Sequence, residues 1–442
     1  MNSDRHWQGR AAIFTLGCRL NQADSALMAA GLERHGFVLV PWGEPCDLAV
    51  INSCTVTAAA ARKTRQTARV LRRQQPDAYL VLAGCDANIS AATWLEDGSA
   101  DLVVPNPVKT RLFNYLPEKL VPGPPQAIKV VFADWGTFRE EATGSFAERT
   151  RANLKIQEGC EFFCSYCIVP YARGPARSRV WDDCLRKARE LVVMGYHEIV
   201  LTGVNIATYQ NQGRDLADLL AALLELPGDC RIRLGFTEPG PILKRVIDRM
   251  AANPRICRFL HLPLQYGENT ILQAMNRRYS LAEYAAIARH AAGAVPGLCL
   301  GTDIITGFPG ETEATFATCC ATIRDLSINH LHVFTYSPRQ GTPAATFPNQ
   351  VHGDLAQQRA DTLATIGHEK AEAFARSQLG KVVFIITEER NAAGNWEGWS
   401  DHYLRVELVG ADPGENAVVP VRLTDWLTGR QMRGKRAPEE TP

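Results

Sequence analysis

Short apolar stretches alternate with helical patterns over the first 120 residues, and this alternation limits the fold more than any other feature. We expect strands at 11–16, 48–52 and 79–83 and helices at 25–35 and 58–73. Strand–helix alternation is typical of a parallel sheet covered by helices on both faces. The sequence therefore predicts an α/β fold that begins with a doubly wound parallel-sheet domain over residues 1–120.

The chain changes character twice after residue 120. A Val-Pro-Gly-Pro-Pro stretch cannot continue regular structure, so we assign 121–150 to a linker. Over 151–378 the alternation returns, with strands expected at 154–157, 198–201, 231–236, 259–262, 300–305 and 330–335. These units predict a partial (β/α)6 barrel, whose chemistry lies after the carboxyl ends of the strands. Residues 379–442 contain short strands at 381–387, 403–409 and 418–423, which predict a small antiparallel β-barrel with a polar tail.

The composition excludes some classes of protein. Hydrophobic residues make up 46% and charged residues 21%, as in folded proteins. No apolar run approaches the ~18 residues of a membrane span, and the first ten residues lack the apolar segment of a signal peptide. We therefore expect a cytoplasmic protein without a membrane partner. Because the formal net charge is only +1, nucleic-acid binding would have to come from local basic patches.

The chain has 13 cysteines and no export signal, which favours metal or redox chemistry over disulfides. Cys160, Cys164 and Cys167 form a Cys-x-x-x-Cys-x-x-Cys motif after the first strand expected in the barrel. Thiolates normally cap every iron of a [4Fe–4S] cluster, so three cysteines leave one iron open to another molecule. A structural zinc site would usually add a second Cys-x-x-Cys pair or histidines. The motif therefore favours an iron–sulfur cluster.

This motif, in this position, resembles that of the radical S-adenosylmethionine superfamily. The resemblance implies that the open iron binds the amino and carboxylate groups of S-adenosylmethionine. An electron from the cluster would then cleave the sulfonium to give methionine and a 5′-deoxyadenosyl radical, which abstracts hydrogen from a C–H bond. The candidate cofactor contacts are an aromatic residue of the motif and residues expected at the barrel mouth: Tyr166, Thr202, Gly203, Asn205, Gln265 and Glu311.

Three further cysteines follow the first three expected strands. They are Cys18, Cys54 and Cys85. Because the carboxyl ends of adjacent parallel strands meet at one edge of a sheet, we expect the three thiols to converge. Gly17 and Gly84 would let the backbone approach a bulky ligand closely.

The two cysteine trios together resemble the methylthiotransferases, and further stretches at 201–205, 261–265, 274–279 and 334–339 match that family. Tyr266 departs from the small serine that the family usually has there. The resemblance implies a second [4Fe–4S] cluster on Cys18, Cys54 and Cys85 and a C-terminal RNA-associated barrel of the TRAM type. It also implies a second S-adenosylmethionine as methyl donor, with the first-domain cluster carrying the sulfur.

The sequence around Cys18, Leu-Gly-Cys-Arg-Leu-Asn-Gln, is most similar to the branch that acts on N6-threonylcarbamoyladenosine next to the anticodon. The reaction would replace the hydrogen at C2 of that adenine with a methylthio group. It would require tRNA, an electron donor such as flavodoxin or ferredoxin, and a sulfur source. Two alternatives are the same chemistry on isopentenyladenosine or on a ribosomal protein. A third is a non-catalytic, RNA-binding iron–sulfur redox sensor.

Several basic residues are either RNA contacts or solvated surface. The longest run contains Arg62, Lys63, Arg65, Arg69, Arg72 and Arg73. Arg173, Arg177 and Arg179 follow the barrel cysteines and are candidates for contact with substrate or cofactor. Arg430, Arg433, Lys435 and Arg436 form either a disordered tail or an RNA-binding end. The other cysteines, at 46, 184, 230, 257, 299, 319 and 320, are expected to be small hydrophobic residues of the core.

Overall fold

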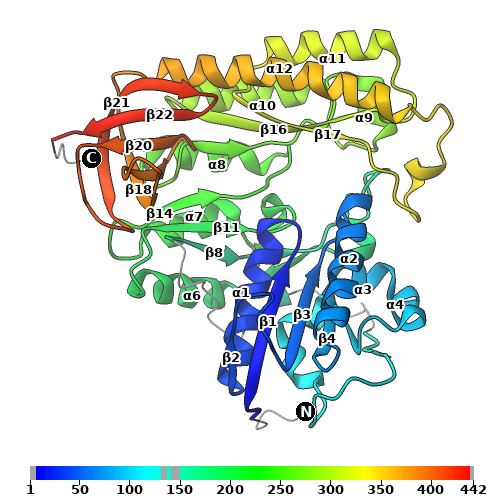
Figure 1. Cartoon of the computed structure of the whole chain (residues 1–442). Coiled ribbons are helices and arrows are strands. Elements are labelled where there is room, and N and C mark those ends of the chain that lie inside the picture. The colour runs from blue at the N-terminus through cyan, green and yellow to red at the C-terminus, as the bar shows by residue number, and fades with distance from the viewer. Residues whose placement is uncertain (1–5, 131–136, 141–149, 439–442) are drawn as a thin grey trace. The chain divides into compact units, whose positions relative to one another are not determined.

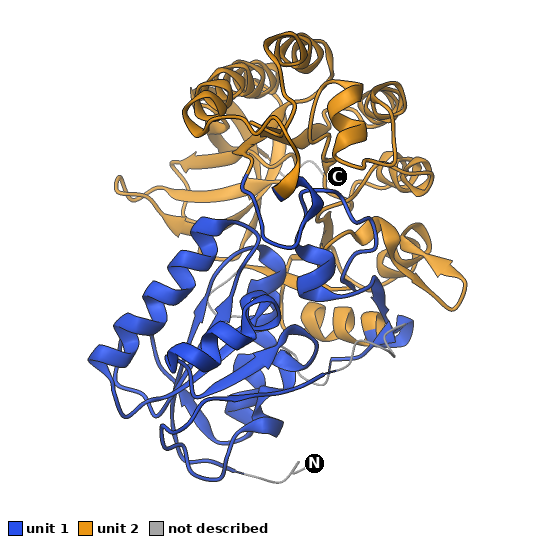
Figure 2. Ribbon diagram, turned by 90° about the vertical axis from the view of Figure 1, so that its right-hand side faces the viewer, with its two compact units in different colours: residues 1–147, 157–183, 337–345 blue, residues 148–156, 184–336, 346–442 orange. Residues whose placement is uncertain are grey.

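The computed structural model describes residues 6–130, 137–140 and 150–438. It contains two compact units that are interleaved along the chain (Figure 2). Unit 1 comprises residues 1–147, 157–183 and 337–345, and unit 2 comprises residues 148–156, 184–336 and 346–442. The cysteine loop of the barrel segment thus belongs to the same unit as the first sheet.

Unit 1 is built on a parallel sheet with the strand order β2-β1-β3-β4-β5-β6 (Figure 1). Its elements are β1 Gly9–Thr15, α1 Arg19–Arg34, β2 Phe37–Leu39, β3 Leu48–Ser53, α2 Ala58–Gln74, β4 Tyr79–Gly84, α3 Cys85–Ile89, α4 Ala91–Asp97, β5 Leu102–Pro105, η1 Asn106–Tyr115 and β6 Gln126–Ala127. A smaller sheet has the order β7-β10-β9. Its strands are β7 Thr137–Phe138, β9 Gln157–Glu158 and β10 Arg177–Arg179, and α5 Val169–Arg173 lies between β9 and β10.

Helices cover both faces of the large sheet, which is why β3 and β4 are buried along their whole length. On one face Val50 belongs to the same core as Met28 of α1. On the other face Ile51 belongs to the same core as Leu71 of α2 and Trp94 of α4. The doubly wound fold predicted for the first 120 residues is therefore confirmed.

Unit 2 contains the strands of the partial barrel. Parallel sheets have the orders β14-β11-β8 and β15-β16-β17, and isolated bridges between Ile232 and Ile256 and between Phe236 and His261 connect them. The elements are β8 Arg151–Lys155, α6 Trp181–Val193 (which begins in unit 1), β11 Glu198–Thr202, η2 Ile206–Thr208, β12 Gln210–Asn211, β13 Arg214–Asp215, α7 Leu216–Leu224, β14 Arg231–Leu234, α8 Ile242–Ala252, β15 Phe259–His261, α9 Asn269–Ala274, α10 Leu281–Ala294, β16 Cys299–Thr306, α11 Glu313–Asp325, β17 His330–Thr335, η3 Pro343–Thr346 and α12 Gly353–Ser377. Each strand expected in the barrel is present.

The C-terminal segment forms a closed barrel with the order β18-β19-β20-β22-β21. Its strands are β18 Val382–Arg390, β19 Trp396–Ser400, β20 Arg405–Val409, β21 Val418–Thr428 and β22 Gln431–Arg436. The expectation of a wholly antiparallel barrel is wrong, because β20 and β22 pair in parallel. The disordered-tail alternative is also wrong for Arg433 and Lys435, which alternate with buried Met432 and Gly434 along β22.

Within unit 2 the C-terminal barrel is attached to the amino-terminal ends of the partial-barrel strands. Glu198 begins β11 and accepts hydrogen bonds from Nε of Arg231 (2.6 Å) and Nε of Arg233 (2.7 Å) on β14. Both arginines also donate to main-chain carbonyls of the C-terminal barrel, including that of Trp399 at 2.8 Å and that of Ser400 at 2.9 Å. Charged groups therefore hold the two barrels together.

No helix in the described part of the chain combines the length and the apolar character that crossing a bilayer requires.

Candidate cofactor and substrate site

Cys18, Cys54 and Cys85 follow β1, β3 and β4, which are neighbours in the parallel sheet of unit 1. The register pairs Ser53 with Gly84, so β3 and β4 end at the same level. The structure thus places the three cysteines at one edge of the sheet, as the sequence predicts.

Two glycines allow the cysteine-bearing loops to approach each other. Gly17 has a φ of +98°, and a Cβ there would lie 2.9 Å from Sγ of Cys54. Gly84 has a φ of +99°, and a Cβ there would lie 2.7 Å from the carbonyl oxygen of Ser53. Any other residue at either position would push the loops apart.

The thiols of this trio interact electrostatically. Burial, together with negative charge on Cys85 and Cys18, raises the pKa of Cys54 to about 11, against the opposing effect of Arg173. Cys54 and Cys85 are buried, whereas Cys18 is exposed. Metal ions supply the positive charge that several adjacent thiolates need, and binding releases the protons. Three such donors fit a [4Fe–4S] cluster with one iron left open.

The second trio lies in the loop between β9 and α5, also in unit 1. The N–H of Cys160 donates to the carbonyl of Gly174 at 3.1 Å, and the N–H of Cys167 donates to the carbonyl of Cys164 at 2.9 Å. Cys164 is buried and the other two are half-buried, as is Tyr166 in the same loop. The loop is thus closed on itself, and its three thiols also fit a cluster with one open iron.

A buried network of charged and amide side chains joins the first trio to the second cysteine loop. Nζ of Lys109 lies 2.7 Å from Oδ2 of Asp24 and donates to Oδ1 of Asn21 at 3.0 Å. Arg173, the last residue of α5, lies 3.6 Å from Asp24 and pairs with Glu158. All five side chains are almost completely buried. Nothing in their spacing along the sequence predicts this network.

Amide side chains extend the network to the cysteines themselves. Nδ2 of Asn21 donates at 2.9 Å to the carbonyl of Ser53, the residue before the second cysteine of the first trio. Nδ2 of Asn106 donates to Sγ of Cys85 at 3.3 Å and to the carbonyl of Ala172 in α5 at 2.7 Å. One amide therefore contacts both a thiol of the first trio and the helix that follows the second.

A third, distant segment completes unit 1. Arg339 donates to Oγ1 of Thr55 at 2.6 Å, and Oγ of Ser337 accepts from the N–H of Ala58 at 3.1 Å. The N–H of Ala344 donates to the carbonyl of Ser165 in the second cysteine loop at 2.8 Å. Residues 337–345 thus contact the segments that follow one cysteine of each trio. The family-like stretch at 334–339 was the only signal for this role.

The candidate residues at the mouth of the partial barrel lie in unit 2. Thr202 ends β11, Gly203 follows it, and Oδ1 of Asn205 accepts from the N–H of Ala207 to cap η2. Gln265 has a φ of +70°, which is strained for a residue other than glycine and is often found at functional sites. Their contact with S-adenosylmethionine stays a prediction.

Glu311 has a structural role that the sequence did not predict. Its carboxylate accepts from the hydroxyl of Tyr266 at 2.9 Å and from the N–H of Gly307, and it lies 3.3 Å from Arg359. Burial raises the pKa of Glu311, while these partners oppose the shift. Tyr266, which stands where the resembled family usually has a serine, is fully buried. Through its hydrogen bond to Glu311, it helps to anchor the loop that follows β16.

The basic residues of α2 divide into two groups. Arg62, Lys63, Arg69 and Arg73 are exposed, whereas Arg65 and Arg72 are half-buried. Of these two, Arg72 lies 2.7 Å from the buried carboxylate of Asp101. Its candidate role as an RNA contact therefore competes with a structural ion pair.

The arginines that follow the second cysteine loop do not form an exposed basic surface. Arg173 and Arg179 are buried, and Arg179 pairs with Asp183 at 2.7 Å. Arg173 nevertheless interacts electrostatically with Cys85 and Cys18 of the first trio, so contact of these arginines with substrate or cofactor stays a prediction.

The cysteines outside the two trios lie where small hydrophobic residues are expected. Cys46 is half-buried, and the others, at 184, 230, 257, 299, 319 and 320, are buried. Burial raises the pKa of Cys257, Cys299 and Cys319 to about 12, which keeps these thiols protonated.

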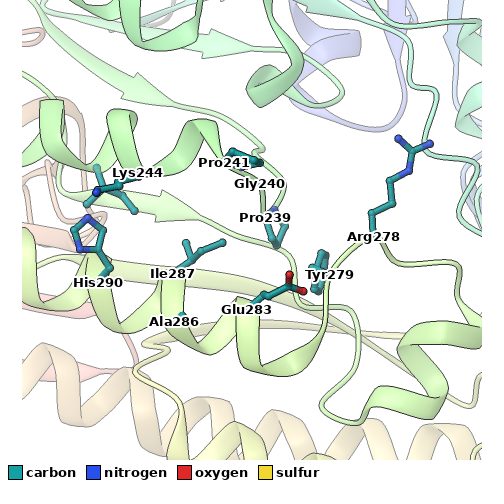
Figure 3. A pocket seen from close by; sticks show the side chains of 11 residues that line it. Pro239, Gly240, Pro241, Lys244, Arg278, Tyr279, Glu283, Ala286, Ile287 and His290 are labelled. Atoms are coloured by element: carbon teal, nitrogen blue, oxygen red, sulfur yellow. The ribbon is translucent and has the colours of Figure 1, made fainter.

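An open groove of about 600 Å³ lies on the outer helices of unit 2, between α8 and α10 (Figure 3). Lys244, Arg278 and His290 are among its lining residues. Tyr279, at its edge, donates to the carbonyl of Leu264 at 2.8 Å and so supports the segment after β15. None of the predicted site residues lines this groove.

Comparisons with known proteins agree with this architecture. The family model described as "Radical SAM superfamily" matches residues 154–322, and the model described as "Uncharacterized protein family UPF0004" matches residues 10–105. Among solved structures, the radical S-adenosylmethionine methyltransferase TsrM from Kitasatospora setae superposes with a TM-score of 0.54. That likeness covers 76% of this chain and 75% of the other at 15% identity, so it supports the fold alone.

Curated relatives match over most of the chain. The Bacillus subtilis protein named threonylcarbamoyladenosine tRNA methylthiotransferase MtaB is 34% identical, and the match covers 93% of each chain. The Thermotoga maritima protein of the same name is 31% identical over 93% of this chain and 94% of its own. The tRNA-2-methylthio-N(6)-dimethylallyladenosine synthase of Cereibacter sphaeroides is 33% identical over 93% of this chain and 95% of its own. The chain therefore belongs to the radical S-adenosylmethionine tRNA methylthiotransferase family.

Proposed function

We propose that this chain replaces the hydrogen at C2 of N6-threonylcarbamoyladenosine, next to the anticodon of tRNA, with a methylthio group. The observation that carries the proposal is the presence of two cysteine trios in one compact unit, joined by a buried network. A redox sensor or a structural iron–sulfur protein has no need for two sites that each leave an iron open.

[4Fe–4S] clusters and S-adenosylmethionine are the cofactors of this family, and when bound they supply the electron, the radical and the methyl group. We assign one cluster to Cys160, Cys164 and Cys167 and a second to Cys18, Cys54 and Cys85. The chain's own residues hold the thiols in place and exclude water. Asn106 donates to Cys85, and Lys109 and Arg173 place positive charge beside the first trio. The target C2–H has no useful acidity near neutral pH, so the protein needs no general base there.

The choice of adenosine rests on the residues around Cys18 and on two of the relatives named above. A relative named for dimethylallyladenosine is almost equally similar: it is 33% identical, against 34% for the Bacillus subtilis relative named for threonylcarbamoyladenosine. The isopentenyl branch is therefore the second candidate, because overall similarity does not separate the two.

We further propose that tRNA binds through the exposed basic residues of α2 and through the C-terminal barrel. An electron donor and a sulfur source complete the reaction, which we place in the cytoplasm together with tRNA. The helix position supports this role for α2, since Thr55, just before it, follows a cysteine of the first trio.

The deciding experiment is mass spectrometry of nucleosides in tRNA from a strain that lacks the gene. Loss of 2-methylthio-N6-threonylcarbamoyladenosine, restored by the wild-type gene, is the expected result. Loss of the isopentenyl counterpart, with the threonylcarbamoyl product intact, would contradict the proposal and favour the second candidate.

Cysteine variants test the separate roles that we assign to the two cysteine trios. Cys54→Ala should abolish methylthiolation but retain cleavage of S-adenosylmethionine to 5′-deoxyadenosine, because the second trio is intact. Cys164→Ala should abolish both activities. Cys46→Ala is the matched control, since this half-buried cysteine lies outside both trios. Normal product from Cys54→Ala, or no cleavage by the wild-type protein, would refute the assignment.

A further inference from the structure

The strands β15, β16 and β17 carry a polar cluster on one face. They pair in parallel, with His261 opposite Gly301, Gly301 opposite His330 and Asp303 opposite His332. Since successive side chains of a strand alternate between faces, His261, Asp303, His330 and His332 share one face. The helices lie on the other face, where Thr302 accepts from the hydroxyl of Tyr284 in α10. The cluster therefore faces the interior of the partial barrel.

The polar atoms of this cluster converge. One ligand-type atom from each of His261, Asp303 and His332 lies within 4.8 Å of the other two. Nε2 of buried His261 lies 3.2 Å from Oδ1 of Asp303, but no hydrogen-bond partner has suitable geometry among the described residues. A Cβ at position 301 would lie 3.1 Å from Nδ1 of His261, so Gly301 keeps the space beside this ring open.

Exposed aromatic rings flank the cluster. Phe236 is 38% exposed and stands edge-on to His261, with ring centroids 4.7 Å apart. Phe334 is 50% exposed and nearly parallel to His332, with an interplanar angle of 19°. Exposed rings beside hydrogen-bonding groups suit a nucleobase that carries a polar substituent, because the base can stack while the substituent is bound.

We propose that His261, Asp303 and His332 bind the N6 substituent of the target adenine and select the threonylcarbamoyl group over the isopentenyl group. This inference rests on the function proposed above. The threonylcarbamoyl group offers N–H and hydroxyl donors to the carboxylate of Asp303 and presents its own carboxylate to the imidazoles. The isopentenyl group contains only carbon and hydrogen, so it would cover these side chains without satisfying them.

The expected preference for the threonylcarbamoyl substrate follows from this difference in hydrogen-bonding groups between the two substituents. A site built to hydrogen-bond a substrate group rejects an analogue that covers its polar atoms without pairing them. We expect the wild-type protein to prefer the threonylcarbamoyl substrate by at least about a hundredfold in kcat/KM. Removing one partner of a charged hydrogen bond should reduce that preference by about 10- to 100-fold.

The test uses two anticodon stem-loop RNAs that differ only in the N6 group of the target adenosine. The cluster-loaded, full-length protein is assayed with each RNA, and the 2-methylthio nucleosides are quantified by mass spectrometry. His332→Phe and Asp303→Asn should lower kcat/KM for the threonylcarbamoyl RNA while the value for the isopentenyl RNA stays constant or rises. A purely structural defect would lower both values together and leave their ratio unchanged. His290→Phe, on the outer face of α10, is the control and should change neither value.

Two results would overturn the inference. One is an unchanged ratio in both cluster variants. The other is a loss of the wild-type preference for the threonylcarbamoyl RNA when EDTA is added after cluster loading. The three residues would then act through a bound cation. If the wild-type protein fails to modify the threonylcarbamoyl RNA at all, the proposed function itself is contradicted.

Discussion

Replacing Glu198 by glutamine should loosen the attachment of the C-terminal barrel to the partial barrel. The side chain of Glu198 is completely buried, and its carboxylate makes three hydrogen bonds of 2.6–2.9 Å to Arg231 and Arg233. Glu198→Gln keeps the shape but leaves two buried guanidinium groups without their counter-charge. Breaking a buried ion pair by removing one partner typically costs about 3–5 kcal/mol.

The loss can be measured locally by hydrogen exchange on the full-length protein. Amides of β11, β14 and β19 should open with a free energy lower by about 3–5 kcal/mol, while those of unit 1 change little. The control is Glu372→Gln, because Glu372 forms an exposed pair with Arg376 and such pairs contribute about 0–1 kcal/mol. If the opening free energies of the two variants fall by the same small amount, the ion pairs do not hold the barrels together.

The pH dependence provides a second check with a definite sign. Burial works against the charged form, but Arg233 and Arg231 hold the pKa of Glu198 well below its usual value of 4.5. Its contribution to stability is therefore complete above about pH 4.5 and is lost as the pH falls below that value. Calorimetry should show a steeper acid-induced decrease in Tm for the wild type than for Glu198→Gln.

Three further outcomes are expected. After anaerobic reconstitution the chain should contain about eight iron atoms, and replacing the second cysteine trio by alanine should leave about four; a full load would refute the ligand assignment. Gly17→Ala should also leave about four iron atoms, because the new Cβ collides with Cys54 of the first trio. Gly293→Ala, where no atom lies within 4 Å of the new Cβ, should retain the full iron load. Replacing Arg62, Lys63 and Arg69 by glutamine should weaken tRNA binding and reduce the slope of log K against log salt by about two units. An unchanged slope would make α2 an ordinary solvated helix.

Periodicity and spacing were enough to predict β1, β3 and β4 of the parallel sheet and the strands of the partial barrel, but not the sheet strands β2, β5 and β6. They failed where polar or charged residues interrupt the apolar pattern of an element. The helix expected at 25–35 begins at Arg19, because Asn21 and Asp24 are buried in its first turns and disguise the apolar face. The last strand was hidden in the same way, since the charges of β22 concealed its alternation with Met432 and Gly434.

The candidate site was predictable only in part. The cysteines could be found because thiols are rare and their spacing is distinctive. Lys109, Glu158 and Asn106 have no such signal, because their role comes from long-range contacts that form only in the folded unit. His261 begins one of the family-like stretches, but its proximity to His332 had no signal, because the two residues belong to different strands and are brought together by the sheet.

The interleaving of unit 1 along the chain also affects when it can form during synthesis. Thr55 and its partner Arg339 are separated by 284 residues. A ribosome that adds about 5–20 residues per second needs roughly 15 to 60 s to cover that distance. During this interval the thiols of the first trio have been made, but the segment that closes the unit has not. Iron loading should therefore follow synthesis of residues 337–345, and brief exposure of shorter nascent chains to oxidants should damage this protein more than exposure of the completed one.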